Sequence, residues 1–325
     1  MVTSQPVTGT DLRHHTVQVP ATSANLGAGF DAFGLALDRH LVVRSVPASA
    51  QAERVRVLDG TAVPQGDDNL VWRAFVAFCD HRGVAVPDVR LQARTAIPLE
   101  RGLGSSSAAI VAGLTLAREL TAERVGDLEV VEVATAIEGH PDNVAPAVLG
   151  GLVACARADD GRLVVRRRNP TAALRPVALV PAERQSTEQA RALLPDRLDR
   201  AEVTEQAARA GHVIGALTGA WPPVASLSGD LLHEPARAAA MPASAAVLAE
   251  LRAAGVPAWL SGAGPSVAAV LQTGAEVEHL ATLAGPRGFE AVPLAWELSG
   301  ARSCPDDGCG LAGVRDCAVC PRRRL

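Results

Sequence analysis

The chain has 325 residues, of which 48% are apolar, and this is enough for about two domains with packed cores. Its formal net charge is −4 and only 3% of its residues are aromatic, so the composition does not predict a nucleic-acid-binding surface. The sequence contains no lysine, which excludes Walker A loops, protein kinases and pyridoxal phosphate enzymes, because each of these classes needs one.

No stretch of about 18 consecutive apolar residues occurs, and the polar segment over residues 1–13 lacks an apolar run. We therefore expect neither a membrane span nor a secretory signal. The expected compartment is the cytoplasm, and the expected partners are small molecules, with no nucleic acid and no membrane.

The first half of the chain mixes segments that alternate like strands with segments that have helical spacing. In chain order we expect a strand over 16–20, a small polar loop over 21–30, a strand over 41–46, a helix over 69–81 and a strand over 89–96. A Gly/Ser loop over 101–107 then leads into helices over 108–120 and 127–138. A short helix that ends at 150–151 and strands over 152–157 and 163–168 complete this half.

After about residue 170 the pattern restarts with a strand over 177–180, helices rich in Ala and Leu, and a strand with a Gly loop over 258–265. This order predicts an α+β protein with two domains, over residues 14–168 and 169–300. A Cys/Arg-rich tail over 301–325 follows them.

One Gly/Ser-rich segment joins a predicted strand to a predicted helix. It consists of Pro98, Leu99, Glu100, Arg101, Gly102, Leu103, Gly104, Ser105, Ser106, Ser107 and Ala108. Its glycines allow the backbone to approach a ligand closely, N–H groups at the helix N-terminus attract a phosphate, and a serine hydroxyl can reach Mg²⁺. A serine N-cap on a flexible turn would give the same pattern. A dinucleotide fingerprint fits less well, because Ser107 stands where its third Gly or Ala is needed.

Other segments of the chain favour the phosphate-binding interpretation of this loop. Three stretches resemble the three motifs of GHMP kinases, in the same order along the chain: 20–31 (PATSANLGAGFD), the loop over 102–108, and 261–266 (SGAGPS). Within that superfamily, three segments resemble homoserine kinases: 138–146 (EGHPDNVAP), 187–195 with its Ala-Arg-x-Leu-Leu-Pro, and 233–237 (HEPAR). The resemblance covers roughly residues 16–299.

The resemblance implies a two-domain GHMP kinase fold, with an N-terminal ATP-binding domain like ribosomal protein S5 and a ferredoxin-like C-terminal domain. The implied activity is the ATP-dependent phosphorylation of L-homoserine to O-phospho-L-homoserine in threonine biosynthesis, with Mg²⁺ as cofactor. Some GHMP kinases pair a catalytic Asp with Lys, so the absence of lysine matches the homoserine kinases, which lack an obvious strong base. A homodimer is left open.

The resemblance also implies a substrate site. The residues it assigns to the substrate are Asn25, Asp31, His140, Thr187, Arg191, Arg237 and Gly264, and the catalytic set among them is Asn25, Asp31, His140 and Arg191. Homoserine is a zwitterion, so its ammonium needs acceptors such as Asp31 and its carboxylate needs donors such as Arg191. The match at Arg237 is looser, because Ala236 replaces an aromatic residue usual in the family. Without the resemblance, Asn25 and Asp31 would be interpreted as turn residues and His140 as a helix breaker. Arg191 and Arg237 would be interpreted as solvated surface charges.

For Mg²⁺ the resemblance implies a serine of the phosphate loop and a glutamate on a nearby helix. The expected pair is Ser106 with Glu132, which lies eight residues before His140. Glu132 and Glu138 are six residues apart, so they differ by about 240° around a helix and cannot both face one ion. Glu138 is expected to support His140.

Two alternatives to this function stay open. One is another GHMP small-molecule kinase, for mevalonate, a sugar or a diphosphocytidyl substrate, which Asn25 and Asp31 disfavour because such substrates have no ammonium. The other is a catalytically silent paralogue that binds ATP or an amino acid, against which the intact Gly, Ser, Glu and His motifs argue.

Four of the six cysteines lie near the end of the chain: Cys304, Cys309, Cys317 and Cys320. Four thiolates can bind Zn²⁺, but only the last two cysteines have a standard ligand spacing. We therefore expect an unfolded extension over 301–325, so that residues 1–301 suffice for activity.

Overall fold

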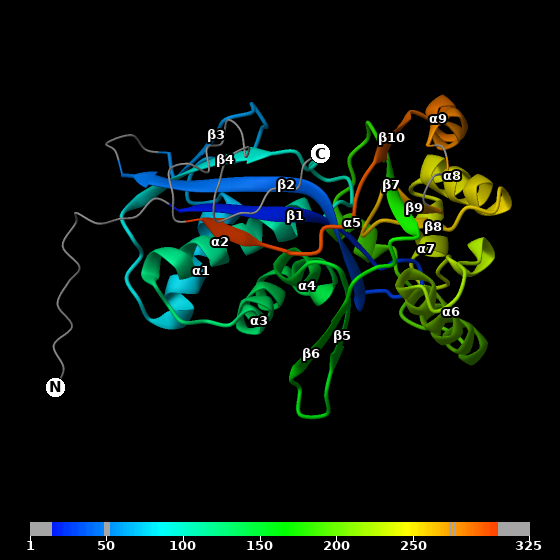
Figure 1. The fold of residues 1–325 in the computed structure, drawn as a ribbon, viewed down its shortest axis with the longest axis horizontal. Coiled ribbons are helices and arrows are strands. Elements are labelled where there is room, and N and C mark those ends of the chain that lie inside the picture. Colours follow the sequence, from blue (N-terminus) through cyan, green and yellow to red (C-terminus); the bar gives the residue numbers. More distant parts are fainter. Residues whose placement is uncertain (1–14, 49–52, 273–274, 276, 305–325) are drawn as a thin grey trace.

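The computed structural model describes residues 15–48, 53–272, 275 and 277–304. Two sheets, each with its own helices, form two domains that lie side by side (Figure 1). The α+β class expected from the order of elements is confirmed. None of the helices in the described residues is long and apolar enough to cross a membrane.

In the described residues the first sheet has seven strands, in the order β11-β1-β2-β4-β3, with β5 and β6 joined to it through β2. All its neighbours are antiparallel except β3 and β4. The strands are β1 (Thr16–Ala24), β2 (Phe33–Pro47), β3 (Val55–Val57), β4 (Val89–Thr95), β5 (Leu152–Arg157), β6 (Leu163–Arg168) and β11 (Arg302–Cys304).

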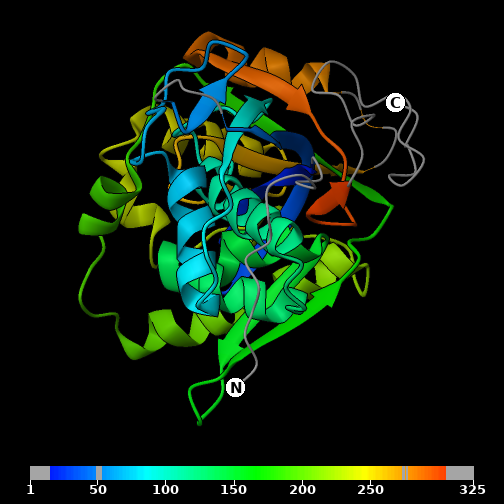
Figure 2. The ribbon, with the colours of Figure 1, turned by 90° about the vertical axis from the view of Figure 1, so that its left-hand side faces the viewer.

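Four helices form one layer on a face of this sheet (Figures 1 and 2). They are α1 (Leu70–Arg82), α2 (Ser105–Thr121), α3 (Asp127–Glu138) and α4 (Pro141–Leu149). Their apolar spacing buries residues such as Phe75, Phe78 and Leu114 against the sheet. Asn69 caps the start of α1, because its side chain accepts a hydrogen bond from the Val71 N–H.

Within the part of the chain that the structure describes, the second sheet has four antiparallel strands in the order β10-β7-β9-β8. They are β7 (Leu174–Pro181), β8 (Ala258–Leu260), β9 (Val267–Gln272) and β10 (Phe289–Pro293). The helices of this part are α5 (Thr187–Ala192), α6 (Arg200–Thr218), α7 (Glu234–Ala238), α8 (Pro242–Ala253) and α9 (Glu278–Ala284), with 3₁₀ turns at Ala225–Leu227 and Gly285–Arg287. An apolar cluster that includes Leu26, Leu35 and Trp259 joins the two domains.

The structure corrects the predicted start of the tail at residue 301. Arg302–Cys304 forms β11, which returns to the first sheet and pairs with β1 through Thr16 and Cys304. Cys304 is buried in that strand, which sequence spacing alone could not reveal because its partner lies almost 300 residues away. Cys309, Cys317 and Cys320 lie outside the described residues.

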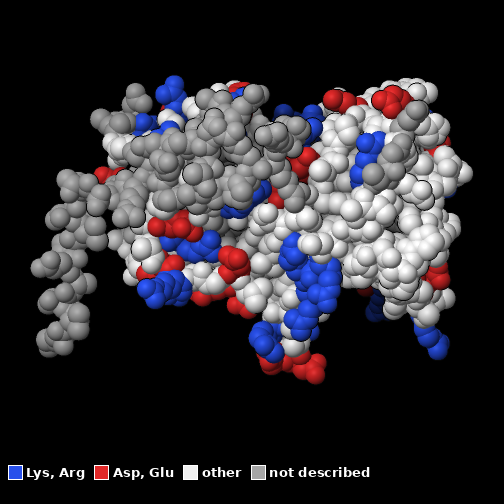
Figure 3. Space-filling view, viewed as in Figure 1, with Lys and Arg blue, Asp and Glu red and all other residues white. Residues whose placement is uncertain are grey.

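A hairpin of β5 and β6 projects from the first domain (Figure 1). Basic side chains gather along it and acidic ones at its tip (Figure 3). The exposed arginines are Arg157, Arg162, Arg166 and Arg168, and the exposed acidic residues are Asp159 and Asp160.

Candidate active site

The three glycine-rich motifs come together where the two domains meet. The Ser23 and Ser261 hydroxyls lie 2.8 Å apart, and Ser261 Oγ donates to the Gly102 carbonyl at 2.6 Å. The backbone adds a hydrogen bond of 3.2 Å from the Gly262 N–H to the Ala24 carbonyl. The first and third motifs therefore hold the phosphate loop between them.

Two glycines of the phosphate loop are required by this packing. Gly102 and Gly104 have φ angles of 72° and 69°, in the left-handed region that favours glycine. A Cβ on Gly102 would lie 2.1 Å from the Ser261 carbonyl oxygen, and a Cβ on Gly104 would lie 1.9 Å from Thr22 Oγ1. A larger residue at either position would push the three motifs apart.

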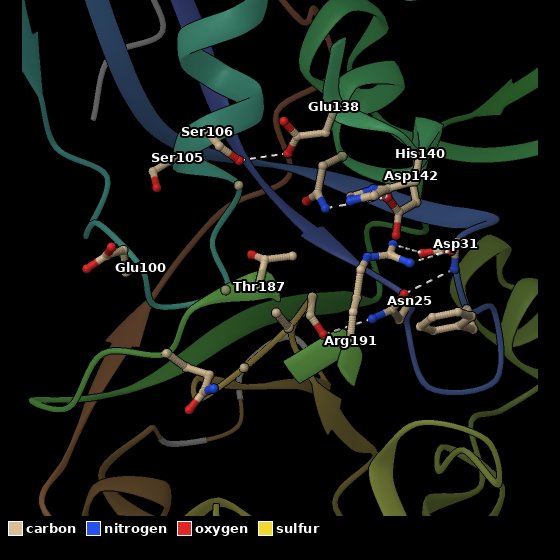
Figure 4. Close-up of a pocket in the computed structure, with 18 of the residues that line it drawn as sticks. Asn25, Asp31, Glu100, Ser105, Ser106, Glu138, His140, Asp142, Thr187 and Arg191 are labelled. Atoms are coloured by element: carbon tan, nitrogen blue, oxygen red, sulfur yellow. Dashed lines mark hydrogen bonds and ion pairs between the residues drawn. The ribbon is translucent and has the colours of Figure 1, made fainter. Parts of the chain in front are cut away.

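Helix α2 begins at Ser105, and Gly104 before it provides no side-chain cap. The first N–H groups of the helix therefore have no intrahelical partner, and with the helix dipole they form a positive site suited to phosphate. Ser105 and Ser106 line the pocket at this helix end (Figure 4). Ser106 Oγ and Ser107 Oγ both donate to Glu138 Oε1, at 2.7 and 2.8 Å.

The glutamate that contacts these serines is Glu138, and not Glu132, which the sequence prediction paired with Ser106 at the metal site. Glu138 is the last residue of α3, and Gly139 ends that helix in a left-handed conformation, which leaves Glu138 next to the start of α2. Glu132 is exposed and does not line the pocket. Helical spacing rightly allowed only one of the two to face the site, but it could not say which.

The first-motif loop is bracketed by Asn25 and Asp31, both with left-handed backbones. Such conformations are uncommon outside glycine and are most easily adopted by Asn and Asp. Asn25 is buried: its Nδ2 donates to the Gly262 carbonyl at 2.8 Å, and its Oδ1 accepts from the Asp31 N–H at 3.1 Å. Asn25 therefore fixes the loop that presents Asp31 to the pocket.

Asp31 forms a two-pronged ion pair with Arg191 of α5 (Figure 4). Arg191 Nη2 lies 2.6 Å from Asp31 Oδ1, and Nη1 lies 3.2 Å from Oδ2. The two side chains are 34% and 37% exposed, so the pair is open to the pocket that both line. Two residues 160 positions apart in the chain thus meet in one pocket.

Arg237 of α7 differs from Arg191, because it is 2% exposed and its acceptors among the described residues are all neutral. Its Nε donates to the Ala190 carbonyl at 3.2 Å, and its Nη1 to the Gly262 carbonyl at 3.0 Å and to His233 Nδ1 at 3.2 Å. Within the described part of the chain, no carboxylate forms an ion pair with it inside 4.0 Å. Burial, and then the neighbouring Arg191, lower the pKa of Arg237 to about 10, so it stays charged at neutral pH.

His140 stands at the N-cap of α4, with Nδ1 2.5 Å from Asp142 Oδ1. Because a carboxylate accepts, Nδ1 is the donor and Nε2 is left for another partner. Burial acts to lower the pKa of His140, but the hydrogen bond and charge of Asp142 outweigh it and raise that pKa. Asp142 itself is almost completely buried.

The predicted substrate residues Thr187 and Gly264 also line this pocket. Other lining residues are not predicted from the sequence, and three of them carry polar or aromatic side chains next to the predicted ones: Phe30, Asp142 and Asn143. Phe30 lies under both arginines, with its ring centroid 5.6 Å from the Arg191 Cζ and 5.9 Å from the Arg237 Cζ. All three residues stand inside recognised motifs, but no periodicity distinguishes them from their neighbours.

The predicted phosphate segment does not face the site uniformly. Glu100, Gly102, Gly104, Ser105 and Ser106 line the pocket, whereas Leu103, Ser107 and Ala108 are buried. Arg101 donates to the backbone carbonyls of Leu99, Pro181 and Ala182, which makes it a brace between the loop and the end of β7. Pro98 precedes the residues that contact the pocket.

A second, mostly apolar cavity of about 380 Å³ adjoins the same helix end. It shares Glu100, Ser105 and Ser106 with the first pocket. Its apolar lining includes Leu41, Val55, Leu70, Ala93 and Ala109, which come from β2, β3, α1, β4 and α2, and Leu99 of the loop before α2. A flat apolar group attached to a phosphate chain would fit next to the helix N-terminus.

Comparison with known proteins accounts for both domains. The model of the GHMP kinase N-terminal domain matches residues 69–151, and that of the GHMP kinase C-terminal domain matches residues 214–282. The chain is 40% identical to a homoserine kinase of Synechococcus over 78% of this chain and 84% of that one. It is 42% identical to a homoserine kinase of Mycolicibacterium vanbaalenii, over the same shares of the two chains.

The fold agrees with these sequence matches. The crystal structure of a homoserine kinase from Cytophaga hutchinsonii superposes with a TM-score of 0.72 at 24% identity, covering 94% of this chain and all of that one. The chain therefore belongs to the homoserine kinase family of the GHMP kinases.

Proposed function

We propose that this protein transfers the γ-phosphate of ATP to the side-chain hydroxyl of L-homoserine. The observation that carries the proposal is a single pocket with a phosphate-binding helix end on one side and Asp31, Arg191 and Arg237 on the other. An anion and a zwitterion can therefore bind within reach of each other. The relatives above carry the name of this activity.

The nucleotide binds across the two adjoining cavities. Its phosphates take the free N–H groups at the start of α2, where Gly102 and Gly104 keep the backbone open. Its base takes the apolar cavity beside that helix end, in which Leu70 and Leu99 are part of the lining. The shared residues Ser105 and Ser106 lie at the junction of the two cavities.

Mg²⁺ prefers hard oxygen ligands, such as those of Ser106, Ser107 and Glu138. It usually leaves several coordination positions to phosphate oxygens and water. Both hydroxyls already donate to one oxygen of Glu138, so the carboxylate is held in place before any ligand arrives. We assign the metal to Ser106 and Glu138. Bound there, Mg²⁺ would neutralise charge that develops on the transferred phosphate.

The amino acid binds by exchanging an internal ion pair for two new ones. Asp31 and Arg191 neutralise each other in the present structure. Homoserine carries its ammonium and carboxylate on one carbon atom, so it can offer the ammonium to Asp31 and the carboxylate to Arg191 at little electrostatic cost. Asp31, His140 and Asp142 place three ligand atoms within 4.8 Å of one another, an acidic group suited to a cation.

Arg237 gives the carboxylate a second and stronger partner. Its charge is buried and no carboxylate in the described structure forms an ion pair with it, so an incoming carboxylate can take that place. Phe30 lies beside both arginines, with its ring under each guanidinium. The carboxylate therefore orients the substrate with its hydroxyl directed away from the arginines, toward the phosphate side.

Catalysis in this arrangement comes from positioning and charge. His140 is oriented by Asp142 and presents Nε2 as the remaining polar atom of its ring. Asn25 acts through the loop, because both ends of its amide bind backbone groups. None of these residues needs to act as a strong base.

A coupled assay of ADP release tests the proposal. Homoserine, serine, threonine, mevalonate and galactose are supplied separately with ATP and Mg²⁺ to the full-length chain. We expect homoserine to be used far better than the others. Preference for mevalonate or galactose would indicate another GHMP kinase, and homoserine binding without ADP release would indicate a silent relative.

A further inference from the structure

His233 is a completely buried histidine that the mechanism above does not use. It precedes α7, and its ring lies against Phe30, with the two centroids 5.4 Å apart. Its Nε2 is 3.4 Å from the Gly27 carbonyl oxygen and 3.7 Å from Asp230 Oδ2. Its Nδ1 is 3.2 Å from Arg237 Nη1.

These neighbours fix the proton on the imidazole. A guanidinium only donates hydrogen bonds, so Nδ1 must accept and carry no proton. Both neighbours of Nε2 are acceptors, so Nε2 carries the proton. Burial lowers the pKa of His233, against the opposing charges of Asp230 and Glu234, and this agrees with a neutral ring.

The choice of a neutral acceptor matters for Arg237. A buried arginine is usually held by a carboxylate, which would cancel its charge. Here the three acceptors are the Ala190 carbonyl, the Gly262 carbonyl and a neutral imidazole. The guanidinium is therefore held in a defined orientation while its charge remains available to the pocket that it lines.

We propose that His233 is a positioning residue, which orients Arg237 toward the substrate carboxylate without neutralising it. The same ring bonds to Gly27 in the first-motif loop, so it ties the arginine to the segment that presents Asp31. The inference rests on the proposed function, because it takes the carboxylate of homoserine as the partner of Arg237.

Two variants of nearly equal shape separate orientation from charge. His233→Asn keeps a neutral acceptor for Arg237 near the place of Nδ1, whereas His233→Asp supplies a charged one. We expect His233→Asn to raise the KM for homoserine by no more than about threefold, and His233→Asp to raise it by about tenfold or more, with the KM for ATP nearly unchanged in both. Equal effects of the two substitutions on homoserine would overturn the proposal.

His233→Leu provides a third variant if His233→Asp does not fold. It removes the acceptor without adding charge, and we expect about a tenfold rise in the KM for homoserine, which His233→Asn largely rescues. Val247→Ala is the matched control, because Val247 is equally buried in the same domain but lies in the apolar core. It should lower the melting temperature and leave both KM values unchanged. A rise in the homoserine KM of Val247→Ala equal to that of His233→Leu would show a merely structural role.

A spectroscopic measurement keeps this inference separate from the proposed function. In ¹⁵N-labelled full-length protein, with the His233 signal assigned by its loss in His233→Asn, we expect Nδ1 to resonate as an unprotonated nitrogen and Nε2 as a protonated one. An imidazolium, or a proton on Nδ1, would overturn the proposal whatever the substrate is. Failure to phosphorylate homoserine with the expected resonances present would instead count against the proposed function.

Discussion

The two sides of the pocket are built from different parts of the chain. We call them the phosphate wall, made of Gly102, Gly104, Ser105, Ser106 and Glu138, and the amino-acid wall, made of Asp31, His140, Arg191 and Arg237. The phosphate wall relies on backbone N–H groups of one loop and helix, supported by a single carboxylate. The amino-acid wall relies on charged side chains from four separate segments.

This difference has a functional consequence. A wall made of backbone recognises a group common to many substrates, because N–H groups bind any phosphate. A wall made of charged side chains recognises one arrangement of charges. The phosphate wall should therefore control turnover with ATP, and the amino-acid wall should control which acceptor is used.

The largest effect is expected for Glu138, the carboxylate of the phosphate wall. Glu138→Ala should lower kcat by about two to three orders of magnitude, because the charge clamp at the transferred phosphate is lost. Steady-state kinetics at saturating Mg²⁺ and both substrates would measure it. Glu132→Ala is the matched control on the same helix and should behave like the unmodified protein; the reverse pattern would restore Glu132 as the metal residue.

On the amino-acid wall, Asp31→Asn should raise the KM for homoserine by about ten- to a hundredfold, because a charged partner of the ammonium is removed. The KM for ATP should change by less than about twofold. Asp196→Asn, at an exposed position beyond α5, serves as the control. A defect confined to ATP would show that Asp31 does not belong to this wall.

The stability of the fold should depend on pH through the Glu297 carboxylate. Burial acts to raise the pKa of Glu297, but hydrogen bonds from His40 and the Ser299 N–H, and the charge of Arg302, lower it from 4.5 to about 2. The carboxylate therefore contributes about 3 kcal/mol of stability above pH 4.5, which is lost as the pH falls from there toward 2.

Urea unfolding between pH 6 and pH 2 would follow this loss. Glu297→Gln should be less stable at neutral pH and should lack this part of the acid dependence. An identical acid dependence in the variant would mean that Glu297 does not contribute it.

The smallest expected effect concerns β11. A chain that ends at Ala301 loses the pairing of Thr16 with Cys304 and the 2.9 Å ion pair of Arg302 with Glu297, whereas a chain that ends at Cys304 keeps both. We expect the shorter chain to lose about 1–2 kcal/mol of stability, measured by thermal melting, with unchanged KM values. Equal stability of the two chains would show that β11 contributes nothing.

Sequence alone predicts the phosphate wall better than the amino-acid wall, and the reason is local. The glycines and serines of the phosphate loop are contiguous, and their φ angles and helix start follow from residue type. The helix over Asp127–Glu138 is predicted to the residue, yet its periodicity does not reveal that Glu138 faces Ser106. That contact depends on how α3 packs against α2.

The residues of the amino-acid wall can be predicted only from the resemblance to homoserine kinases, because their contacts join residues far apart in the chain. Nothing near Asp31 in the sequence indicates that Arg191 will pair with it, or that His233 will hold Arg237. The burial that distinguishes Arg237 from the many surface arginines is a property of the folded domain. The sequence does not distinguish a buried arginine from an exposed one.

The central claim is that one pocket recognises the two charges of an amino acid while it transfers phosphate to its hydroxyl. The most direct measurement compares kcat/KM for homoserine with kcat/KM for two analogues. One is γ-hydroxybutyrate, which lacks the ammonium, and the other is 3-amino-1-propanol, which lacks the carboxylate. We predict that each analogue is used at least about a hundredfold less well than homoserine, and that Asp31→Asn removes the penalty for γ-hydroxybutyrate only. Equal use of homoserine and γ-hydroxybutyrate by the unmodified protein would contradict the account.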